Sequence, residues 1–214
     1  MVNSIIEKIE SKRAGENIPR QHLGLSEIGH KCPRCLWYAH HNTPAKPVDG
    51  RVIRLFRTGN IIEDAIINDL ESIGIEVTDR QREVEIVNGD IVLKGHIDGI
   101  INGQLLEIKS AAEKYFKQLL KVGYEKWNPK YKAQAHVYMV LCELTECMVI
   151  VENKNDSTLY IETLKLDRDY VTKLLIDVFA AITSQQPPER ICPDASWYES
   201  KFCKYQDVCF AVIQ

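Results

Sequence analysis

The pair Asn102-Gly103 constrains the fold of this chain more than any other feature of its sequence. Both residue types tolerate the positive φ that a two-residue type I′ turn requires, and aliphatic residues flank the pair on both sides. The sequence therefore predicts a β-hairpin. If the turn has two residues, Ile101 pairs with Gln104 across the ladder.

The predicted register gathers polar side chains on one face of the hairpin. Counting outward along both strands places Asp98 opposite Glu107 and His96 opposite Lys109. Because side chains alternate across a strand, these four groups share a face. The neighbouring apolar side chains are expected on the other face: Ile97, Leu106 and Ile108.

Two carboxylates opposite each other on a ladder repel, and a divalent cation would remove the repulsion. Carboxylate oxygens suit Mg²⁺ or Mn²⁺, which bind through a few carboxylates together with water and phosphate. Lys109 lies two residues after Glu107, where its ammonium can orient a water molecule or its neutral amine can deprotonate one. The alternative interpretation is a solvated polar face with an incidental acidic pair, because this spacing alone is common.

Length and composition predict one globular domain. The 214 residues include 45% apolar and 27% charged residues. We expect a single domain over 1–214, with a core at about 50–165 and the ends 1–49 and 166–214 packed together. Because the chain has no apolar run of about 18 residues and its first residues do not resemble a signal peptide, we expect no membrane span and a cytoplasmic location.

The charge pattern argues against nucleic-acid binding through bulk positive charge, because the net charge is −3. It does not exclude a nuclease, since carboxylates that hold metal contribute negative charge. Lysines gather locally after the hairpin, and they form either a solvated helical face or a surface that contacts phosphates. These lysines are Lys114, Lys117, Lys121, Lys126, Lys130 and Lys132.

The remaining periodicity predicts a mixed α/β fold. Helices are expected at 3–14, 52–73, 112–122, 129–144 and 167–184, together with a short helix that carries Leu36, Trp37 and Tyr38. Strands are expected at 75–79, 82–88, 91–101, 104–110, 146–153 and 158–165. Gly59 interrupts the helical pattern at 52–73, which indicates either two helices or one helix with a close contact at the glycine.

Two further polar groups flank the hairpin in the sequence. Glu63 follows Gly59 by one helical turn, at the border of an apolar face, where a carboxylate needs a partner unless it is simply solvated. Gln134 and Tyr138 are four residues apart and so share a helical face. They are either satisfied core groups or contacts to nucleic acid or to an active-site lysine.

Seven cysteines in a chain without a secretion signal favour metal ligands or core residues over disulfides. Cys142 and Cys147 adjoin apolar runs, and core packing is the expected role of both. The other five lie near the two ends of the chain: Cys32, Cys35, Cys192, Cys203 and Cys209.

Taken in order, the motifs Gly-x3-Glu, Gly-x2-Asp, Glu-x-Lys and Gln-x3-Tyr between Gly59 and Tyr138 resemble the PD-(D/E)XK nuclease superfamily, in its RecB-type exonuclease branch. That branch includes CRISPR-associated RecB-like exonucleases and related phage exonucleases. The resemblance implies an α/β restriction-endonuclease-like core, with a mixed central sheet flanked by helices, a helical N-terminal part and a cysteine-bearing C-terminal tail. It also implies a Mg²⁺- or Mn²⁺-dependent DNA exonuclease in a phage or prokaryotic setting.

The resemblance also implies roles for individual residues. Asp98 and Glu107 would be the central metal ligands, and Lys109 would position or activate water. The other implied site residues are Glu63 as a helix-borne ligand, the carbonyl of Ile108 as a further ligand, and Gln134 and Tyr138 as contacts to DNA or to the lysine.

Many relatives hold a [4Fe–4S] cluster with one cysteine before the core and three after it, spaced Cys-x2-Cys-x5-Cys. Three positions match here: Cys32, Cys203 and Cys209. The fourth is Ser200, and serine is a poor ligand for iron–sulfur or zinc. Cys192 or Cys35 could supply the missing thiolate. The site would hold an iron–sulfur cluster, zinc or nothing.

Two other functions remain open. One is an endonuclease on the same core, and the other is a non-catalytic, metal-stapled DNA-binding module. Aromatic side chains either stack on bases or pack against the body of the protein, namely Trp37, Tyr38, Trp127 and Trp197.

Overall fold

The computed structural model describes residues 2–15 and 22–211. Its helices are α1 (Val2–Gly15), the 3₁₀ turn η1 (Leu25–Glu27), α2 (Pro33–His40), α3 (Gly50–Ser72), α4 (Glu113–Val122), α5 (Tyr124–Trp127), α6 (Pro129–Leu141), α7 (Arg168–Ile182), α8 (Tyr198–Lys201) and α9 (Gln206–Phe210). Its strands are β1 (Glu83–Asn88), β2 (Ile91–His96), β3 (Gly99–Ile101), β4 (Gln104–Ala111), β5 (Glu146–Asn153) and β6 (Leu159–Lys165).

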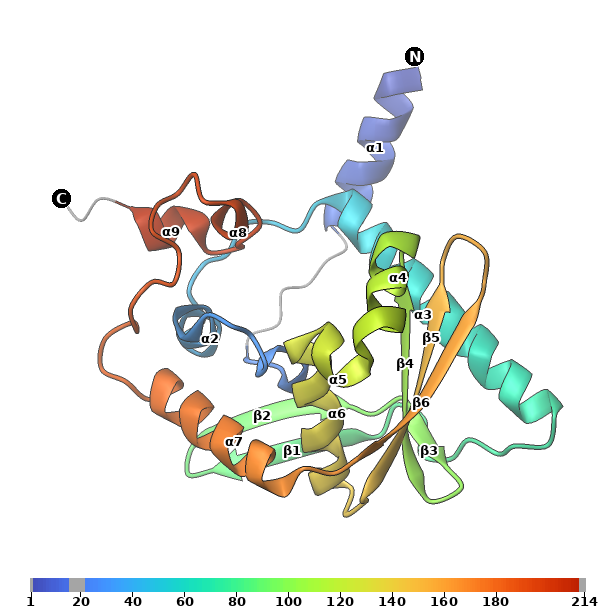
Figure 1. The fold of residues 1–214 in the computed structure, drawn as a ribbon. Helices are drawn as coiled ribbons and strands as arrows, with labels where there is room; N and C mark the ends of the chain where they lie inside the picture. Colours follow the sequence, from blue (N-terminus) through green and yellow to red (C-terminus); the bar gives the residue numbers. More distant parts are fainter. Residues whose placement is uncertain (1, 16–21, 212–214) are drawn as a thin grey trace.

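The central sheet has the order β3-β4-β5-β6, with antiparallel pairing at both sides and parallel pairing between β4 and β5. A parallel pair needs a long crossover, which α4, α5 and α6 supply. Helix α3 lies on one side of this sheet and the crossover helices lie on the other (Figure 1). The mixed sheet flanked by helices confirms the fold class predicted from the sequence.

Side chains along β4 alternate between two hydrophobic cores. Leu106 and Ile108 pack with α3, in a cluster that includes Ile66, Ile67, Val77, Ile101 and Ile150. Leu105 packs on the opposite side, with the crossover helices. Since both faces are covered, β4 is buried along most of its length. Ile97, expected beside Leu106, belongs instead to the core on the crossover side.

The prediction of one strand over 91–101 is wrong, because the chain passes from one sheet to another at Ile97-Asp98. Two strands, β2 and β3, occupy this stretch. Strand β2 pairs with β1 in a separate two-stranded sheet, where His96 is the partner of Glu83. The predicted pairing of His96 with Lys109 is therefore wrong. Only the part after Asp98 continues into the hairpin.

The expected strand 75–79 is reduced to a single bridge between Thr78 and Ile100. Backbone hydrogen bonds of 2.9 and 2.8 Å join these two residues in both directions. The bridge does not extend because Asp79 and Gln81 adopt positive φ angles of 55° and 53°, which end the extended conformation.

Helix α3 runs without a break through Gly59, and a Cβ at that glycine would meet no atom within 4 Å. One helix rather than two is present, and there is no close contact at the glycine. Its apolar pattern is only partly buried. Ile66 and Ile67 reach the core, whereas four apolar side chains of this segment are exposed: Leu55, Phe56, Ile61 and Ile73.

Segments from the two ends of the chain contact each other. The indole of Trp37 on α2 donates to the carbonyl of Ser184 just after α7 (2.9 Å). The backbone N–H of Lys46 donates to the carbonyl of Lys204 (2.8 Å). Helices α8 and α9 lie near α2 (Figure 1). Among the described residues, no helix is both long and apolar enough to span a membrane.

Candidate active site

The Asn102-Gly103 turn forms as predicted, with positive φ angles of 49° and 76°. Ile101 pairs with Gln104, and the ladder ends where Gly99 pairs with Leu106. A Cβ at Gly99 would lie 2.6 Å from a methyl group of Val77, so glycine lets the strand pass close to its neighbour.

Asp98 lies one residue beyond the last ladder pair. Its Oδ2 accepts a hydrogen bond from the backbone N–H of Ile108 (2.7 Å), and the side chain is buried. The carboxylate thus takes the place of a strand carbonyl. This contact fixes Asp98 beside the segment that carries Glu107 and Lys109.

Glu107 and Lys109 form a buried ion pair. The Lys109 ammonium contacts Glu107 Oε1, lies 4.0 Å from Asp98 Oδ2 and donates to the carbonyl of Ile108 (3.2 Å). Glu107 is fully buried, and its Oε2 has no hydrogen-bond partner. One carboxylate oxygen is therefore held by the lysine, while the other is free to accept a further cation or donor.

Burial and the nearby charges shift both pKa values of this pair upward. Burial is the main cause that raises the pKa of Glu107 to about 7, with Asp98 acting in the same direction and Lys109 opposing both. Burial alone would lower the pKa of Lys109, but Glu107 and Asp98 outweigh it and raise that pKa above its usual value. The lysine is therefore a protonated ammonium at neutral pH.

Glu63 faces this group from α3. Its Oε1 accepts a hydrogen bond from the amide of Gln81 (2.6 Å). Burial raises the pKa of Glu63, and repulsion from Asp98 adds to the increase. The structure thus brings three acids and one lysine toward the same end of the hairpin.

Gln134 and Tyr138 lie buried on α6. The Tyr138 hydroxyl sits against the backbone of β2, where a Cβ at Gly95 would come within 2.2 Å of it. Tyr138 therefore packs between the small sheet and the core, and its side chain is 1% exposed.

Sequence reasoning did not identify Tyr131, whose ring centroid lies 5.5 Å from the Lys109 ammonium. It precedes Gln134 by three residues and Tyr138 by seven on α6. This helical spacing was the available signal, because it places Tyr131 on the same face as the two residues that were identified.

The cysteines of the two ends gather between α2 and the C-terminal segment. Cys35 Sγ lies 3.5 Å from Cys203 Sγ, and Arg34 donates to Cys209 Sγ (3.8 Å). Ser200 is buried, with its hydroxyl donating to the carbonyl of Ala195 (3.3 Å). Cys147 is fully buried, as core packing predicts, whereas Cys142 is half-buried and accepts from Arg82.

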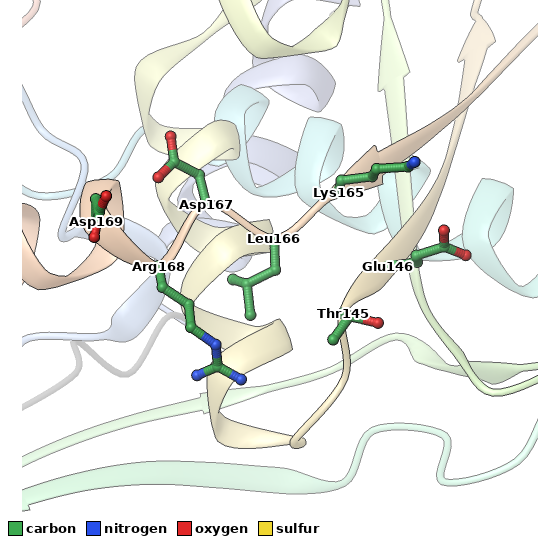
Figure 2. A pocket seen from close by; sticks show the side chains of 7 residues that line it. All are labelled: Thr145, Glu146, Lys165, Leu166, Asp167, Arg168 and Asp169. Carbon is green, nitrogen blue, oxygen red and sulfur yellow. The ribbon is translucent and has the colours of Figure 1, made fainter.

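Neither the acidic group around Lys109 nor the cysteine group is a preformed metal centre. Within residues 2–15 and 22–211, no group of three or more His, Cys, Asp or Glu side chains is arranged to hold a metal ion. An open depression of about 640 Å³ lies away from both groups, between the start of β5, the end of β6 and the start of α7. It is lined by Glu146, Lys165 and Arg168 among others (Figure 2).

No family model matches the chain, and no curated protein matches it. Solved structures do. A crystal structure described as SSO0001 superposes with a TM-score of 0.53 at 19% identity, over 98% of both chains. The alkaline exonuclease LHK-Exo from Laribacter hongkongensis superposes with a TM-score of 0.53 at 18% identity, over 82% of this chain and 90% of that one.

The same exonuclease in complex with dAMP superposes with a TM-score of 0.50 at 17% identity, over 82% of this chain and 90% of that one. Likeness at this level of identity concerns the fold. The chain has a mixed α/β fold with a restriction-endonuclease-like core, and this fold is similar to that of LHK-Exo.

Proposed function

We propose that this protein is a metal-dependent DNA exonuclease that hydrolyses phosphodiester bonds with Asp98, Glu107 and Lys109. The observation that carries the proposal is the buried oxygen Oε2 of Glu107, which has no hydrogen-bond partner beside a second carboxylate and an ammonium. An unpartnered buried carboxylate oxygen is costly unless something binds it. The exonuclease activity of LHK-Exo, which has the same fold, supports the proposal.

The donor set fits Mg²⁺ or Mn²⁺, which prefer oxygen ligands. Asp98 and Glu107 would hold the ion, with Glu63 and the carbonyl of Ile108 as further ligands. When bound, the metal would lower the pKa of a coordinated water and orient the scissile phosphate. The bond of Gln81 to Glu63 (2.6 Å) orients that carboxylate beforehand.

Lys109 acts as an electrostatic group in this proposal. In the metal-free protein its pKa is raised by Glu107 and Asp98 against the lowering effect of burial, which favours the protonated ammonium. The side chain retains 18% exposure. An ammonium in this position would stabilise negative charge developing on a phosphate at the site.

We propose single-stranded or end-exposed DNA as the substrate, with a role in replication, recombination or repair. LHK-Exo, which has a similar fold, has been solved in complex with dAMP, and this supports a nucleotide-binding site in this fold. Placement in the RecB-type branch, close to CRISPR-associated and phage exonucleases, is likewise our proposal and rests on the sequence motifs.

The test is degradation of end-labelled linear and closed-circular DNA, single- and double-stranded, with Mg²⁺, Mn²⁺ or EDTA. We expect metal-dependent loss of nucleotides from an end, reduced about 100-fold or more in Asp98→Asn, Glu107→Gln and Lys109→Ala. Glu146→Gln, in the separate depression, is the control and should retain activity.

Three outcomes would contradict the proposal. Full activity in Asp98→Asn would show that the proposed site does not carry the reaction. Cleavage of closed circles would favour the endonuclease. DNA binding without cleavage under any metal would favour the non-catalytic, metal-stapled module.

We also propose that the end cysteines ligate a soft metal centre, either a [4Fe–4S] cluster or zinc. Thiolates are the ligands both centres prefer, and the contact between Cys35 and Cys203 supports Cys35 as the replacement for Ser200. Metal analysis and visible absorbance of anaerobically purified protein test this. Cys35→Ser and Cys203→Ser should lose the metal, and Cys142→Ser should keep it.

A further inference from the structure

The face of α6 that meets β4 presents an aromatic ring to the only lysine of the candidate site. The Lys109 ammonium lies 5.5 Å from the ring centroid of Tyr131, within the range of a cation–π contact. Tyr131 is half-buried, and Lys109 is mostly buried. A cation–π contact is stronger in such a partly desolvated place than on an open surface.

Neighbouring aromatic residues hold the Tyr131 ring in place. Trp127 lies 5.3 Å away between ring centroids, and Tyr124 stacks at 6.4 Å with an interplanar angle of 23°. Tyr124 is fully buried and is fixed in turn by its backbone N–H, which donates to Glu162 (2.9 Å). The ring that faces Lys109 is therefore part of a packed aromatic layer.

The contacts of the ammonium explain what this layer does. The ammonium forms an ion pair with Glu107, lies 4.0 Å from Asp98 Oδ2 and donates one hydrogen bond to the carbonyl of Ile108. A lysine side chain has four flexible carbons, so it can swing away unless further contacts hold it. The Tyr131 ring supplies such a further contact to the ammonium.

We propose that Tyr131 is a positioning residue that holds the Lys109 ammonium beside Glu107 and Asp98 through the face of its ring. The inference rests on the proposed nuclease function and deepens it, because it assigns a residue outside the four sequence motifs to the catalytic lysine. A base-stacking role for Tyr131 is the competing explanation.

The test compares Tyr131→Leu and Tyr131→Met, which remove the aromatic face, with Tyr131→Phe, which keeps it. We expect kcat to fall about 10-fold in Tyr131→Leu and Tyr131→Met, with KM within about twofold of the wild-type value. Tyr131→Phe should match the wild type in both constants. Tyr115→Leu is the matched control, since Tyr115 contacts Lys114 at 6.0 Å on the exposed surface of α4.

A second readout does not depend on activity. Acylation of lysine side chains in the metal-free protein, followed by peptide mass spectrometry, reports the accessibility of Lys109. We expect faster labelling of Lys109 in Tyr131→Leu and Tyr131→Met than in wild type or Tyr131→Phe, with other lysines unchanged. This comparison decides whether Tyr131 holds Lys109 even if the wild type cleaves no DNA, in which case the proposed function fails separately.

Several results would overturn the inference. Wild-type kcat and wild-type labelling in Tyr131→Leu would show that the ring does not hold the lysine. A raised KM with unchanged kcat would indicate base stacking. Equal loss in Tyr131→Phe and Tyr131→Leu would assign the effect to the hydroxyl group.

Discussion

Gly95 lies where α6 approaches β2 most closely. A Cβ at this position would come within 2.2 Å of the Tyr138 hydroxyl and 3.1 Å of Leu25 Cβ. Because the surrounding core is packed, Gly95→Ala should lower the free energy of unfolding by about 1–3 kcal/mol. Urea denaturation measures this change, and an unchanged midpoint would show that the helix and strand can separate without cost.

Gly59 is the opposite case and provides the matched comparison. It lies inside α3, and an added Cβ would meet nothing within 4 Å. Gly59→Ala should therefore raise the free energy of unfolding by about 0.5–1 kcal/mol, because alanine loses less backbone entropy in a helix. A destabilised variant would be evidence against a continuous helix at this point.

At the residue scale, the sequence predicted what local geometry controls. The turn at Asn102-Gly103 sets the register, so the proximity of Asp98 and Glu107 followed from counting. His96 was misassigned because its partner, Glu83, lies in a strand whose pairing the turn does not control. Tyr131 was missed because its contact depends on how α6 packs against the sheet.

His136 joins three helical elements. Its Nδ1 accepts from the backbone N–H of Asp167 at the start of α7 (3.1 Å), so the ring proton lies on Nε2, which donates to Glu125 on α5 (2.7 Å). The side chain on α6 is fully buried. It therefore satisfies the backbone N–H of Asp167 at the start of α7.

His136→Phe removes both hydrogen bonds and leaves the Asp167 N–H without this acceptor. We expect a loss of about 2 kcal/mol in the free energy of unfolding, measured by urea denaturation. His96→Phe is the control, because that ring is half exposed, and its effect should stay below about 0.5 kcal/mol. Equal effects in both variants would contradict the structural role of His136.

At the element scale, helices were predicted more reliably than strands. Helices α4, α6 and α7 lie close to their expected ranges because a 3.6-residue pattern over ten or more residues is distinctive. The stretch 91–101 failed as one strand because its partner changes from β1 to β4 within it. The stretch 75–79 is reduced to one bridge because the positive φ angles of Asp79 and Gln81 end the extended conformation. The parallel pairing of β4 with β5 is a property of the crossover and leaves no local mark in the sequence.

At the scale of the whole molecule, an ion pair links the N-terminal turn η1 to the C-terminal segment. Lys204 Nζ lies 3.0 Å from Glu27 Oε1. Burial acts to raise the pKa of Glu27, but Lys204 outweighs it and the pKa lies below its usual value. A lowered folded-state pKa contributes stability at neutral pH that is lost as the pH falls through it.

Glu27→Gln should therefore lower the free energy of unfolding by about 0.5–1 kcal/mol at pH 7, a modest amount because both side chains are partly exposed. The difference from wild type should shrink toward zero as the pH is lowered through the depressed pKa. Denaturation of both proteins across this range measures it, and Lys204→Met should behave alike. A difference that is constant with pH would exclude the ion pair as its cause.

The contact between Cys35 and Cys203 spans 168 residues of sequence, whereas Asp98 and Ile108 are separated by 10. A ribosome adds about 5–20 residues per second, so Cys35 is synthesised roughly 10–30 seconds before Cys203. Translation therefore completes the acidic hairpin well before the two ends can meet. During that interval the thiols of the nascent chain face the surrounding solution, and the cellular supply of metal and oxidant at that moment acts on them before the fold can protect them.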